Sequence, residues 1–361
     1  MHGRTIAAGC GGGPAMSPGV DSIAQSMNNG AIMQSIVVQI QRGDEQMTGT
    51  TSPTIGWIGT GRMGFALATR LLDAGYDVAA YNRTRTKAEP LAAKGATIVD
   101  KPVDLANRDV VFIMVSAPKD LEEVTIGKGG LLTASRAAPR IIVDSSTVSS
   151  ETSALIRRLA DDRGSQFLAS PVSGNPAVIA SGKLTVAVSG PRETFDEVEP
   201  ILSALGRGVT WVGEGEVARL VKIAHNVFLG VVTQALAEIT VLAERGGVSR
   251  EAFLEFLNDS VMGSTFTRYK TPAFVNLDFT PTFTMPLLSK DFDLGLAAAH
   301  ELAVPMPIAA ATAQIVASAM GAGYLSEDFG VLLLEQARRA GVTLTSENAV
   351  VLSGLEVATN G

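Results

Sequence analysis

The chain has 361 residues, 46% of them hydrophobic and 18% charged, with a formal net charge of −7. This length predicts two domains with a substantial core. The acidic balance argues against a nucleic acid or an anionic membrane as partner, because either attracts a basic surface. Cys10 is the only cysteine, so no intramolecular disulfide can form and a cytoplasmic location is expected. With only three histidines besides, at positions 2, 225 and 300, no metal site is predicted.

The N-terminal region is expected to lie outside the folded core. Residues 1–46 lack the basic start and clean apolar block of a signal peptide. Their Gly, Ser, Asn and Met content predicts a mostly disordered tail over residues 1–52, in which only 32–40 has the character of a short strand or helix. Met47 is a second candidate for the start of the functional protein.

No segment is expected to span a membrane. The most apolar long run, residues 220–242, carries too many polar groups for hydrocarbon: Lys222, His225, Asn226, Gln234 and Glu238.

From residue 54 to about 212, short β-rich runs alternate with helical ones, which predicts a parallel doubly wound sheet over residues 53–212. Strands are expected at 54–58, 77–81, 97–99, 109–115, 140–143, 166–168, 184–189 and 209–212. Helices are expected at 64–74, 85–94, 119–124, 150–162 and 192–203. Beyond Gly213 the alternation stops, and an all-α domain is expected over 213–341, with helices at 216–246, 249–259, 287–302, 306–322 and 326–340. Residues 342–361 show no clear period and are interpreted as a loose C-terminal tail.

A glycine motif directly follows the first expected strand. It reads Gly59-Thr-Gly61-Arg-Met-Gly64, in which Gly59 permits a tight turn, Gly61 lets the backbone approach a pyrophosphate, and Gly64 allows close helix packing. The free N–H groups and the dipole of the following helix favour the diphosphate. Turns also collect glycine, but the strand-turn-helix context favours a dinucleotide site.

The end of the second expected strand bears on the choice of dinucleotide. Asn82-Arg83-Thr84 stands where an NAD-preferring site usually offers Asp or Glu to the ribose hydroxyls. Arg83 can bind a phosphate with two hydrogen bonds, and Lys87 adds charge. A solvated basic loop is the alternative interpretation. NADP(H) is therefore expected as the preferred cofactor, with NAD(H) possible.

A small polar turn follows the strand near 166–168. In it, Ser173, the Gly174 amide and Asn175 can present several donors to one anionic group, such as a substrate carboxylate. Taken alone, this segment is more typical of an ordinary turn.

Lys222 and Asn226 lie four residues apart, on one face of the long helix that opens the second domain. A lysine on such an apolar helix either extends to solvent or has a chemical task. His225 is interpreted as a core or interface histidine. Lys290-Asp291 opens a later helical stretch, where a capping or ion-pair role is the default.

Together these segments resemble the β-hydroxyacid dehydrogenase family, which includes 3-hydroxyisobutyrate dehydrogenases, tartronate semialdehyde reductases and glyoxylate/succinic semialdehyde reductases. The resemblance covers residues 54–340 and rests on four motifs in order: Gly59–Gly64, Ser170–Gly174, the Lys222/Asn226 helix and Lys290-Asp291. It implies a Rossmann-type domain, then a helical domain, with the active site between them. It also implies a homodimer or homotetramer formed through the helical domain.

The same resemblance implies hydride transfer between nicotinamide and a small β-hydroxy acid or semialdehyde carboxylate. Lys222 would be the general acid/base, and Asn226 would hold the reacting oxygen or orient Lys222. Ser173, Gly174 and Asn175 would anchor the carboxylate. The implied cofactor-binding residues are Gly59, Thr60, Gly61, Arg62, Met63, Gly64, Asn82, Arg83, Thr84, Lys87, Ser116, Thr147 and Lys290.

Some positions depart from the family pattern. Ala169-Ser170 replaces the usual Asp-Ala, and Asn175 replaces a glycine. These departures surround the expected substrate pocket, so the resemblance implies the class of reaction without the particular substrate. Two alternatives remain open: an imine reductase, which typically carries another residue at position 222, and a non-catalytic oligomeric family member, which is expected to lack the lysine.

Overall fold

The computed structural model describes residues 52–356 except residue 136. The expectations for residues 1–51, including the disordered tail and Cys10, lie outside these residues.

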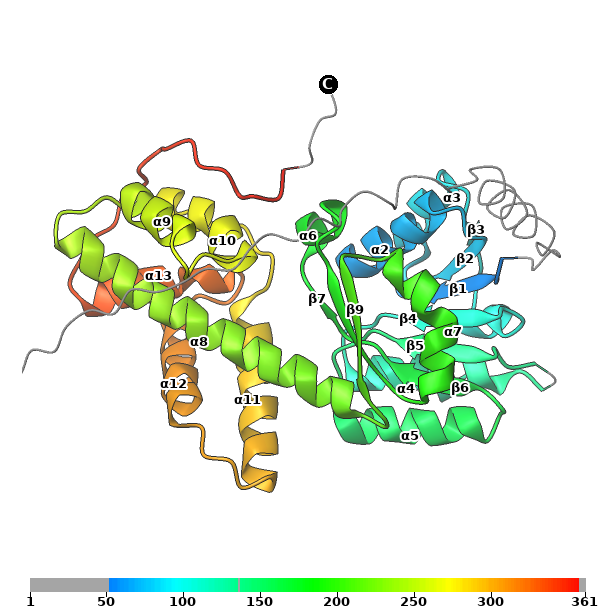
Figure 1. Ribbon diagram of the computed structural model, residues 1–361. Coiled ribbons are helices and arrows are strands. Elements are labelled where there is room, and N and C mark those ends of the chain that lie inside the picture. The colour runs from blue at the N-terminus through cyan, green and yellow to red at the C-terminus, as the bar shows by residue number, and fades with distance from the viewer. Residues whose placement is uncertain (1–51, 136, 357–361) are drawn as a thin grey trace, which may run out of the picture. The chain divides into compact units, whose positions relative to one another are not determined.

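The strands assemble into one sheet, in the order β3-β2-β1-β4-β5-β6-β8-β7, with β9 beside β8 (Figure 1). Their bounds are β1 (Ile55–Ile58), β2 (Val78–Tyr81), β3 (Thr97–Ile98), β4 (Val110–Ile113), β5 (Ile141–Asp144), β6 (Gln166–Ala169), β7 (Val172–Ser173), β8 (Thr185–Ser189) and β9 (Gly208–Gly213). The strand order runs outward from β1 in both directions, so the doubly wound prediction is confirmed.

One part of the sheet differs from the parallel pattern. Strand β8 runs antiparallel to β6 and β7. Parallel neighbours need a long crossover connection, whereas here the chain passes Pro171 into β7 and returns to β8 through the short helix α6 (Pro176–Ala180). The expected substrate turn therefore lies on an antiparallel pair within the sheet, at its β7 edge.

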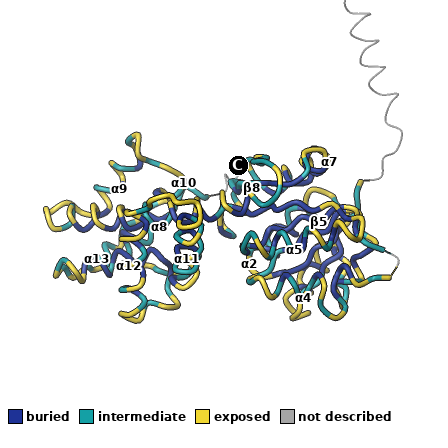
Figure 2. The backbone as a smooth tube through the Cα atoms, turned by 90° about the horizontal axis from the view of Figure 1, so that it is seen from below, coloured by how far each residue is buried: buried dark blue, intermediate teal, exposed yellow. Residues whose placement is uncertain are grey.

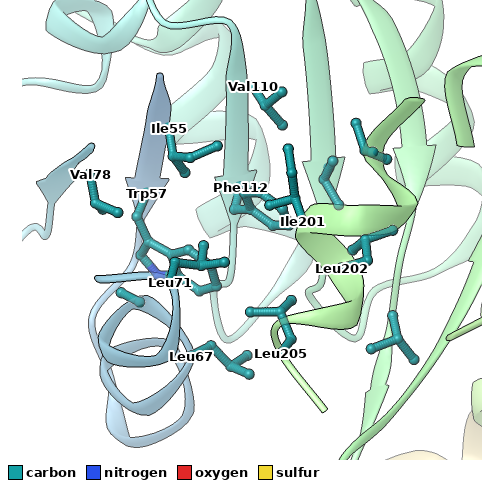
Figure 3. Packing of buried hydrophobic residues seen from close by; sticks show 14 of the residues in the cluster. Ile55, Trp57, Leu67, Leu71, Val78, Val110, Phe112, Ile201, Leu202 and Leu205 are labelled. Atoms are coloured by element: carbon teal, nitrogen blue, oxygen red, sulfur yellow. The ribbon is translucent and has the colours of Figure 1, made fainter. Parts of the chain in front are cut away.

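Helices cover both faces of the sheet. They are α2 (Arg62–Asp73), α3 (Glu89–Ala92), α4 (Pro118–Ile126), α5 (Ser150–Asp161) and α7 (Arg192–Ser203). Successive strand residues point to opposite faces, so Trp57 and Phe112 stack on the face under α2 and α7, with ring centroids 5.3 Å apart (Figure 3). Ile58 and Ile113 pack on the other face, with α4 and α5. Burial on both faces explains why these strands read as nearly continuous apolar runs.

The second domain is all helical, as predicted. Its helices are α8 (Val217–Arg245), α9 (Arg250–Asp259), α10 (Thr265–Asn276), α11 (Met285–Glu301), α12 (Pro307–Gly321) and α13 (Leu332–Arg339). The sequence pattern missed α10, because this helix contains Pro272 and begins with polar residues. Its start is instead stabilised by Ser264 and Thr267, whose side chains cap each other's backbone N–H groups.

Helix α8 runs from the sheet into the helical domain, where it packs on α11 and α13 (Figure 1). By length and composition alone it is apolar enough to cross a membrane. Half of its most apolar window is buried against protein, however, as expected for a core helix, and Figure 2 shows buried and exposed stretches alternating along the helical domain.

A buried ion pair holds the start of α8 against the sheet. Arg219 Nη2 lies 2.6 Å from Asp144 Oδ2 at the end of β5, and both side chains are at most 1% exposed. Arg219 Nε also donates to Ser153 Oγ on α5, at 3.1 Å. Because Lys222 follows Arg219 by about one turn, this pair also sets the position of Lys222 relative to the sheet.

The prediction of a loose C-terminal tail is wrong for residues 342–356. They form neither helix nor strand, but Glu347 accepts hydrogen bonds from the N–H groups of Arg250 and Glu251, at 2.7 and 2.9 Å. Ala349 and Asn276 exchange two further hydrogen bonds. A docked irregular segment has no hydrophobic period, which is why the sequence pattern did not reveal it.

Candidate active site

A pocket of about 600 Å³ lies where the sheet domain meets helices α8, α10 and α11. It is lined by all five residues proposed for catalysis and substrate binding and by part of the cofactor set: Lys222, Asn226, Ser173, Gly174 and Asn175, with Arg62, Met63, Ser116, Thr147 and Lys290. A second pocket, of about 210 Å³, contains most of the other cofactor residues: Gly59, Gly61, Asn82, Arg83, Thr84, Lys87 and again Ser116. Thr60 and Gly64 line neither pocket.

The three motif glycines meet three different requirements. Gly59 has φ +96°, and a Cβ there would lie 2.1 Å from the Met114 carbonyl oxygen. A Cβ on Gly64 would lie 2.0 Å from the Gly59 carbonyl oxygen, so this glycine allows the close approach of α2. A Cβ on Gly61 would meet nothing within 4 Å. The space beside Gly61, at the N-terminus of α2, therefore suits a pyrophosphate.

Further observations fit a dinucleotide cofactor. Ser145 lines the larger pocket, and its Oγ is buried without a hydrogen-bond partner among the described residues. Asn82 orders the turn at the end of β2: its Oδ1 accepts from Thr60 N at 2.9 Å, and its Nδ2 donates to Thr84 O at 2.9 Å. Thr60 thus supports the site through its backbone.

Arg83 lies at the rim of the second pocket and is 73% exposed. Its guanidinium is 3.0 Å from Asp120 Oδ1 and 3.9 Å from Glu123 Oε2. The sequence pattern did not reveal these two carboxylates, because they belong to α4, after a different strand. Arg83 is therefore close to negative charge in the same pocket that would receive an adenosine ribose.

Lys222 is half-buried in the larger pocket, one helical turn before Asn226. Burial lowers the pKa of Lys222 to about 8, while nearby Asp291 raises it and Lys290 lowers it. Asn226 is buried, and its Nδ2 donates to Asp291 Oδ2 at 2.6 Å. Lys290 Nζ lies 3.5 Å from the other oxygen of Asp291. Helices α8 and α11 thus bring two lysines and one carboxylate together.

The interpretation of His225 as a core histidine is wrong, and its alternative interpretation as an interface histidine stays a prediction. His225 lines the larger pocket, and its Nε2 lies 2.9 Å from Ser173 Oγ. Three residues along a helix correspond to about 300°, which leaves His225 about 60° from Lys222 and close to the same face. The three-residue spacing between Lys222 and His225 was therefore the signal in the sequence that could have placed His225 in the site.

The hydrogen bonds around His225 fix its tautomer. Asp291 only accepts, so Asn226 presents its NH₂ group to Asp291 and its Oδ1 to His225 Nδ1, at 3.0 Å. His225 Nδ1 therefore carries the proton, and Nε2 accepts from the Ser173 hydroxyl. Burial, and secondarily Lys222, lower the pKa of His225, which favours this neutral form.

The substrate turn is held by its own backbone and by α6. Gly174 has φ +148°, and a Cβ there would lie 2.8 Å from Val178 Cγ1, so this position requires glycine. Asn175 is the N-cap of α6, and its Oδ1 accepts from Val178 N at 3.0 Å. The expected anchor role of Asn175 is therefore limited to its N–H donors.

Within the described residues, no three His, Cys, Asp or Glu side chains are grouped so that they could hold a metal ion.

A Rossmann-type sheet with space for a pyrophosphate beside Gly61, joined to a helical domain that supplies a half-buried lysine, defines an NAD(P)-dependent oxidoreductase. Comparisons with known proteins agree. The family described as the NAD binding domain of 6-phosphogluconate dehydrogenase matches residues 54–213. The family described as NAD-binding of NADP-dependent 3-hydroxyisobutyrate dehydrogenase matches residues 213–335.

Individual proteins similar to this chain are oxidoreductases as well. The chain is 30% identical to glyoxylate/succinic semialdehyde reductase 1 of Arabidopsis thaliana, over 77% of this chain and 96% of the relative. It is also 31% identical to 2-(hydroxymethyl)glutarate dehydrogenase of Eubacterium barkeri, over 81% of this chain and 97% of the relative. A crystal structure of 3-hydroxyisobutyrate dehydrogenase from Salmonella typhimurium is similar with a TM-score of 0.70 and 26% identity, covering 78% of this chain and 99% of that one. The chain belongs to the β-hydroxyacid dehydrogenase family.

Proposed function

We propose that this protein is an NADP-dependent enzyme that interconverts a small semialdehyde or keto carboxylate and the corresponding hydroxy acid, with Lys222 as general acid/base. The observation that carries this proposal is a half-buried lysine whose pKa is lowered to about 8, in one pocket with the Ser173-Gly174 turn and the start of α2. The relative named glyoxylate/succinic semialdehyde reductase supports this substrate class.

Proton transfer is the task of Lys222. A nicotinamide cofactor, when held in this site, would supply or accept the hydride. In the direction of reduction the Lys222 ammonium donates a proton to the developing alkoxide, and in oxidation its neutral amine removes the hydroxyl proton. A pKa of about 8 keeps both forms accessible near neutral pH. Asn226 is already bonded to Asp291 and His225, so its contribution is to orient these groups around Lys222.

The substrate carboxylate would bind at the turn between β7 and α6. The N–H groups of Gly174 and Asn175 are the available donors, and the Ser173 hydroxyl joins them when it turns from His225 Nε2 to the carboxylate. Holding the carboxylate there fixes the orientation of the carbonyl relative to Lys222, which is the entropic advantage of an ordered site.

Cofactor preference for NADP(H) is part of the proposal. Arg83 and Lys87 line the pocket at the end of β2, and Asn82-Arg83-Thr84 contains no carboxylate to accept from the ribose hydroxyls. A 2′-phosphate would replace the present contact of Arg83 with Asp120.

Oxidation of NADPH, followed with a panel of small semialdehydes, keto acids and cyclic imines, tests the proposal. Semialdehyde or keto carboxylates are expected to react best. Lys222→Ala should keep NADPH binding but lower kcat by about 10²–10⁴-fold, the usual contribution of general acid–base catalysis. Lys94→Ala is the matched control, because Lys94 is exposed and lines neither pocket.

Three results would contradict the proposal in different ways. A Lys222→Ala variant that keeps more than half of the wild-type kcat excludes Lys222 as the acid/base. A preference for cyclic imines would point to an imine reductase. Tight NADPH binding without turnover of any substrate would point to a non-catalytic family member.

A further inference from the structure

The charges around the larger pocket are strongly unbalanced. Among the described residues that line it, five side chains are Lys or Arg, and Asp291 is the single carboxylate: the cations are Arg62, Lys183, Arg207, Lys222 and Lys290. Such a pocket favours an anionic ligand. Lys222 and Lys290 lie beside Asp291, and Arg62 lies at the start of the phosphate-binding helix. Lys183 and Arg207 have no part in the catalytic or cofactor sites described above.

The sheet places Lys183 and Arg207 beyond the substrate turn. Ser173 pairs with Thr185 across β7 and β8, and Thr185 pairs with Gly208 across β8 and β9. Adjacent strands are about 4.8 Å apart, so the Ser173 and Gly208 backbones are separated by roughly 10 Å. Arg207 directly precedes Gly208 and Lys183 lies two residues before Thr185, and both side chains line the same pocket as Ser173 and Thr185. A row of donors therefore continues outward from Ser173.

Neither cation is neutralised within the described part of the chain. Lys183 Nζ donates to the carbonyl oxygen of Gly354, which carries no net charge. The Arg207 guanidinium is exposed and forms no ion pair with any described carboxylate, whereas Lys290 in the same pocket is paired with Asp291. A pair of uncompensated cations at one end of a pocket is suited to an anion that arrives with a ligand.

We propose that Lys183 and Arg207, with the Thr185 hydroxyl between them and Ser173, form a second anion subsite, and that the substrate is a dicarboxylate. One carboxylate binds at the Ser173–Asn175 turn, and the second, at the far end of the same molecule, binds to Arg207 and Lys183. This inference rests on the proposed function, because it takes that turn as the site of the first carboxylate. It narrows the substrate class to oxo or hydroxy acids with two acidic ends.

The cofactor is a less suitable occupant of this subsite. The 2′-phosphate is proposed to bind at Arg83, and neither Lys183 nor Arg207 lines that pocket. The pyrophosphate space lies beside Gly61, at the N-terminus of α2.

Equilibrium binding tests the subsite without requiring turnover. The probes are butyrate, succinate and glutarate, titrated into the enzyme saturated with NADP⁺. At least one of the dicarboxylates should bind about tenfold or more tightly than butyrate, since charge-assisted hydrogen bonds are the strong ones. Arg207→Gln should remove most of this difference, and Arg207→Lys should retain part of it. Lys94→Ala should leave the difference unchanged.

The same variants are then compared in kcat/KM with monocarboxylate and dicarboxylate aldehydes. Arg207→Gln is expected to lower the dicarboxylate-to-monocarboxylate ratio about tenfold. Equal binding of butyrate and both dicarboxylates to the wild type, or an undiminished ratio in Arg207→Gln and Lys183→Gln, overturns the subsite. Weaker NADP⁺ binding in these variants, with the ratio unchanged, would reassign the cations to the cofactor. If dicarboxylate binding depends on Arg207 but no substrate is turned over, the proposed function fails and the subsite stands.

Discussion

Lys222 lies near two charges of opposite sign, Asp291 and Lys290, and its pKa depends on both. Burial lowers the pKa of Lys222 to about 8, Asp291 raises it, and Lys290 lowers it. Since reduction uses the ammonium form, kcat/KM for reduction should fall as pH rises through about 8. The reverse oxidation uses the neutral amine and should rise over the same range.

Variants that remove the charge of Lys290 or Asp291 should shift this pH profile in opposite directions. Lys290→Met removes a cation that lowers the pKa of Lys222, so the falling limb of the reduction profile should move to higher pH. Asp291→Asn should move it to lower pH. The measurement is kcat/KM from about pH 6 to 10 in both directions, with Lys94→Met as the control. A limb that keeps its position in both variants would exclude Lys222 as its origin.

Arg83 offers a test of cofactor choice. A hydrogen bond to a charged group contributes about 1.5–3 kcal/mol, so NADPH should exceed NADH in kcat/KM by about tenfold or more, and Arg83→Ala should remove most of that preference. Asp120→Asn should increase the preference, because it frees Arg83 and removes a negative charge facing the 2′-phosphate. High salt should weaken it, since Arg83 is exposed. A wild type that prefers NADH would contradict the assignment.

At the scale of secondary-structure elements, the start of α8 depends on the buried pair between Arg219 and Asp144. Asp144→Asn leaves the Arg219 charge buried without its partner and should cost about 3–5 kcal/mol in the free energy of unfolding. Urea unfolding followed by circular dichroism measures this cost. Asp196→Asn is the control: its pair with Arg192 is exposed and should be worth at most about 1 kcal/mol. A similar loss in both variants would mean that the pair does not anchor α8.

Elements with a strong local pattern were predictable from the sequence, and those without one were not. The first strand, the glycine turn and α2 follow from apolar periodicity and turn chemistry. Helix α10 and the docked segment at 342–356 do not, because α10 begins with a cap and contains Pro272, and the segment is held by contacts such as those of Glu347 with the start of α9. The segment is stabilised by neighbours that are distant in sequence, and α10 by its own cap together with the ion pair between Lys270 and the distant Asp328.

At the scale of the whole molecule, the helical domain exposes several large apolar side chains, and contiguous exposed apolar surface is typical of interaction sites. Phe228 and Leu242 on α8, Phe256 on α9 and Met262 just after it are each at least 67% exposed. We propose that these side chains are covered in a homodimer or homotetramer formed through the helical domain.

Light scattering after size-exclusion chromatography tests this assembly. Phe228→Asp and Phe256→Asp should shift the protein toward the monomer, because each places a charge in an apolar interface. Ile126→Asp is the control, since Ile126 is exposed on α4 of the sheet domain. A wild-type chain that is monomeric at micromolar concentration would contradict the proposal.

The sequence alone determined the class of fold and the chemical type of the site. Alternating strands and helices, the Gly59–Gly64 turn, and the four-residue spacing of Lys222 and Asn226 are local patterns, set by backbone geometry over one strand or a few helical turns. The tertiary structure alone decided which side chains meet. Ser173 and His225 are 52 positions apart, and Asn226 and Asp291 are 65 apart. Such contacts depend on how whole elements pack against each other, and no periodicity within one element encodes that packing.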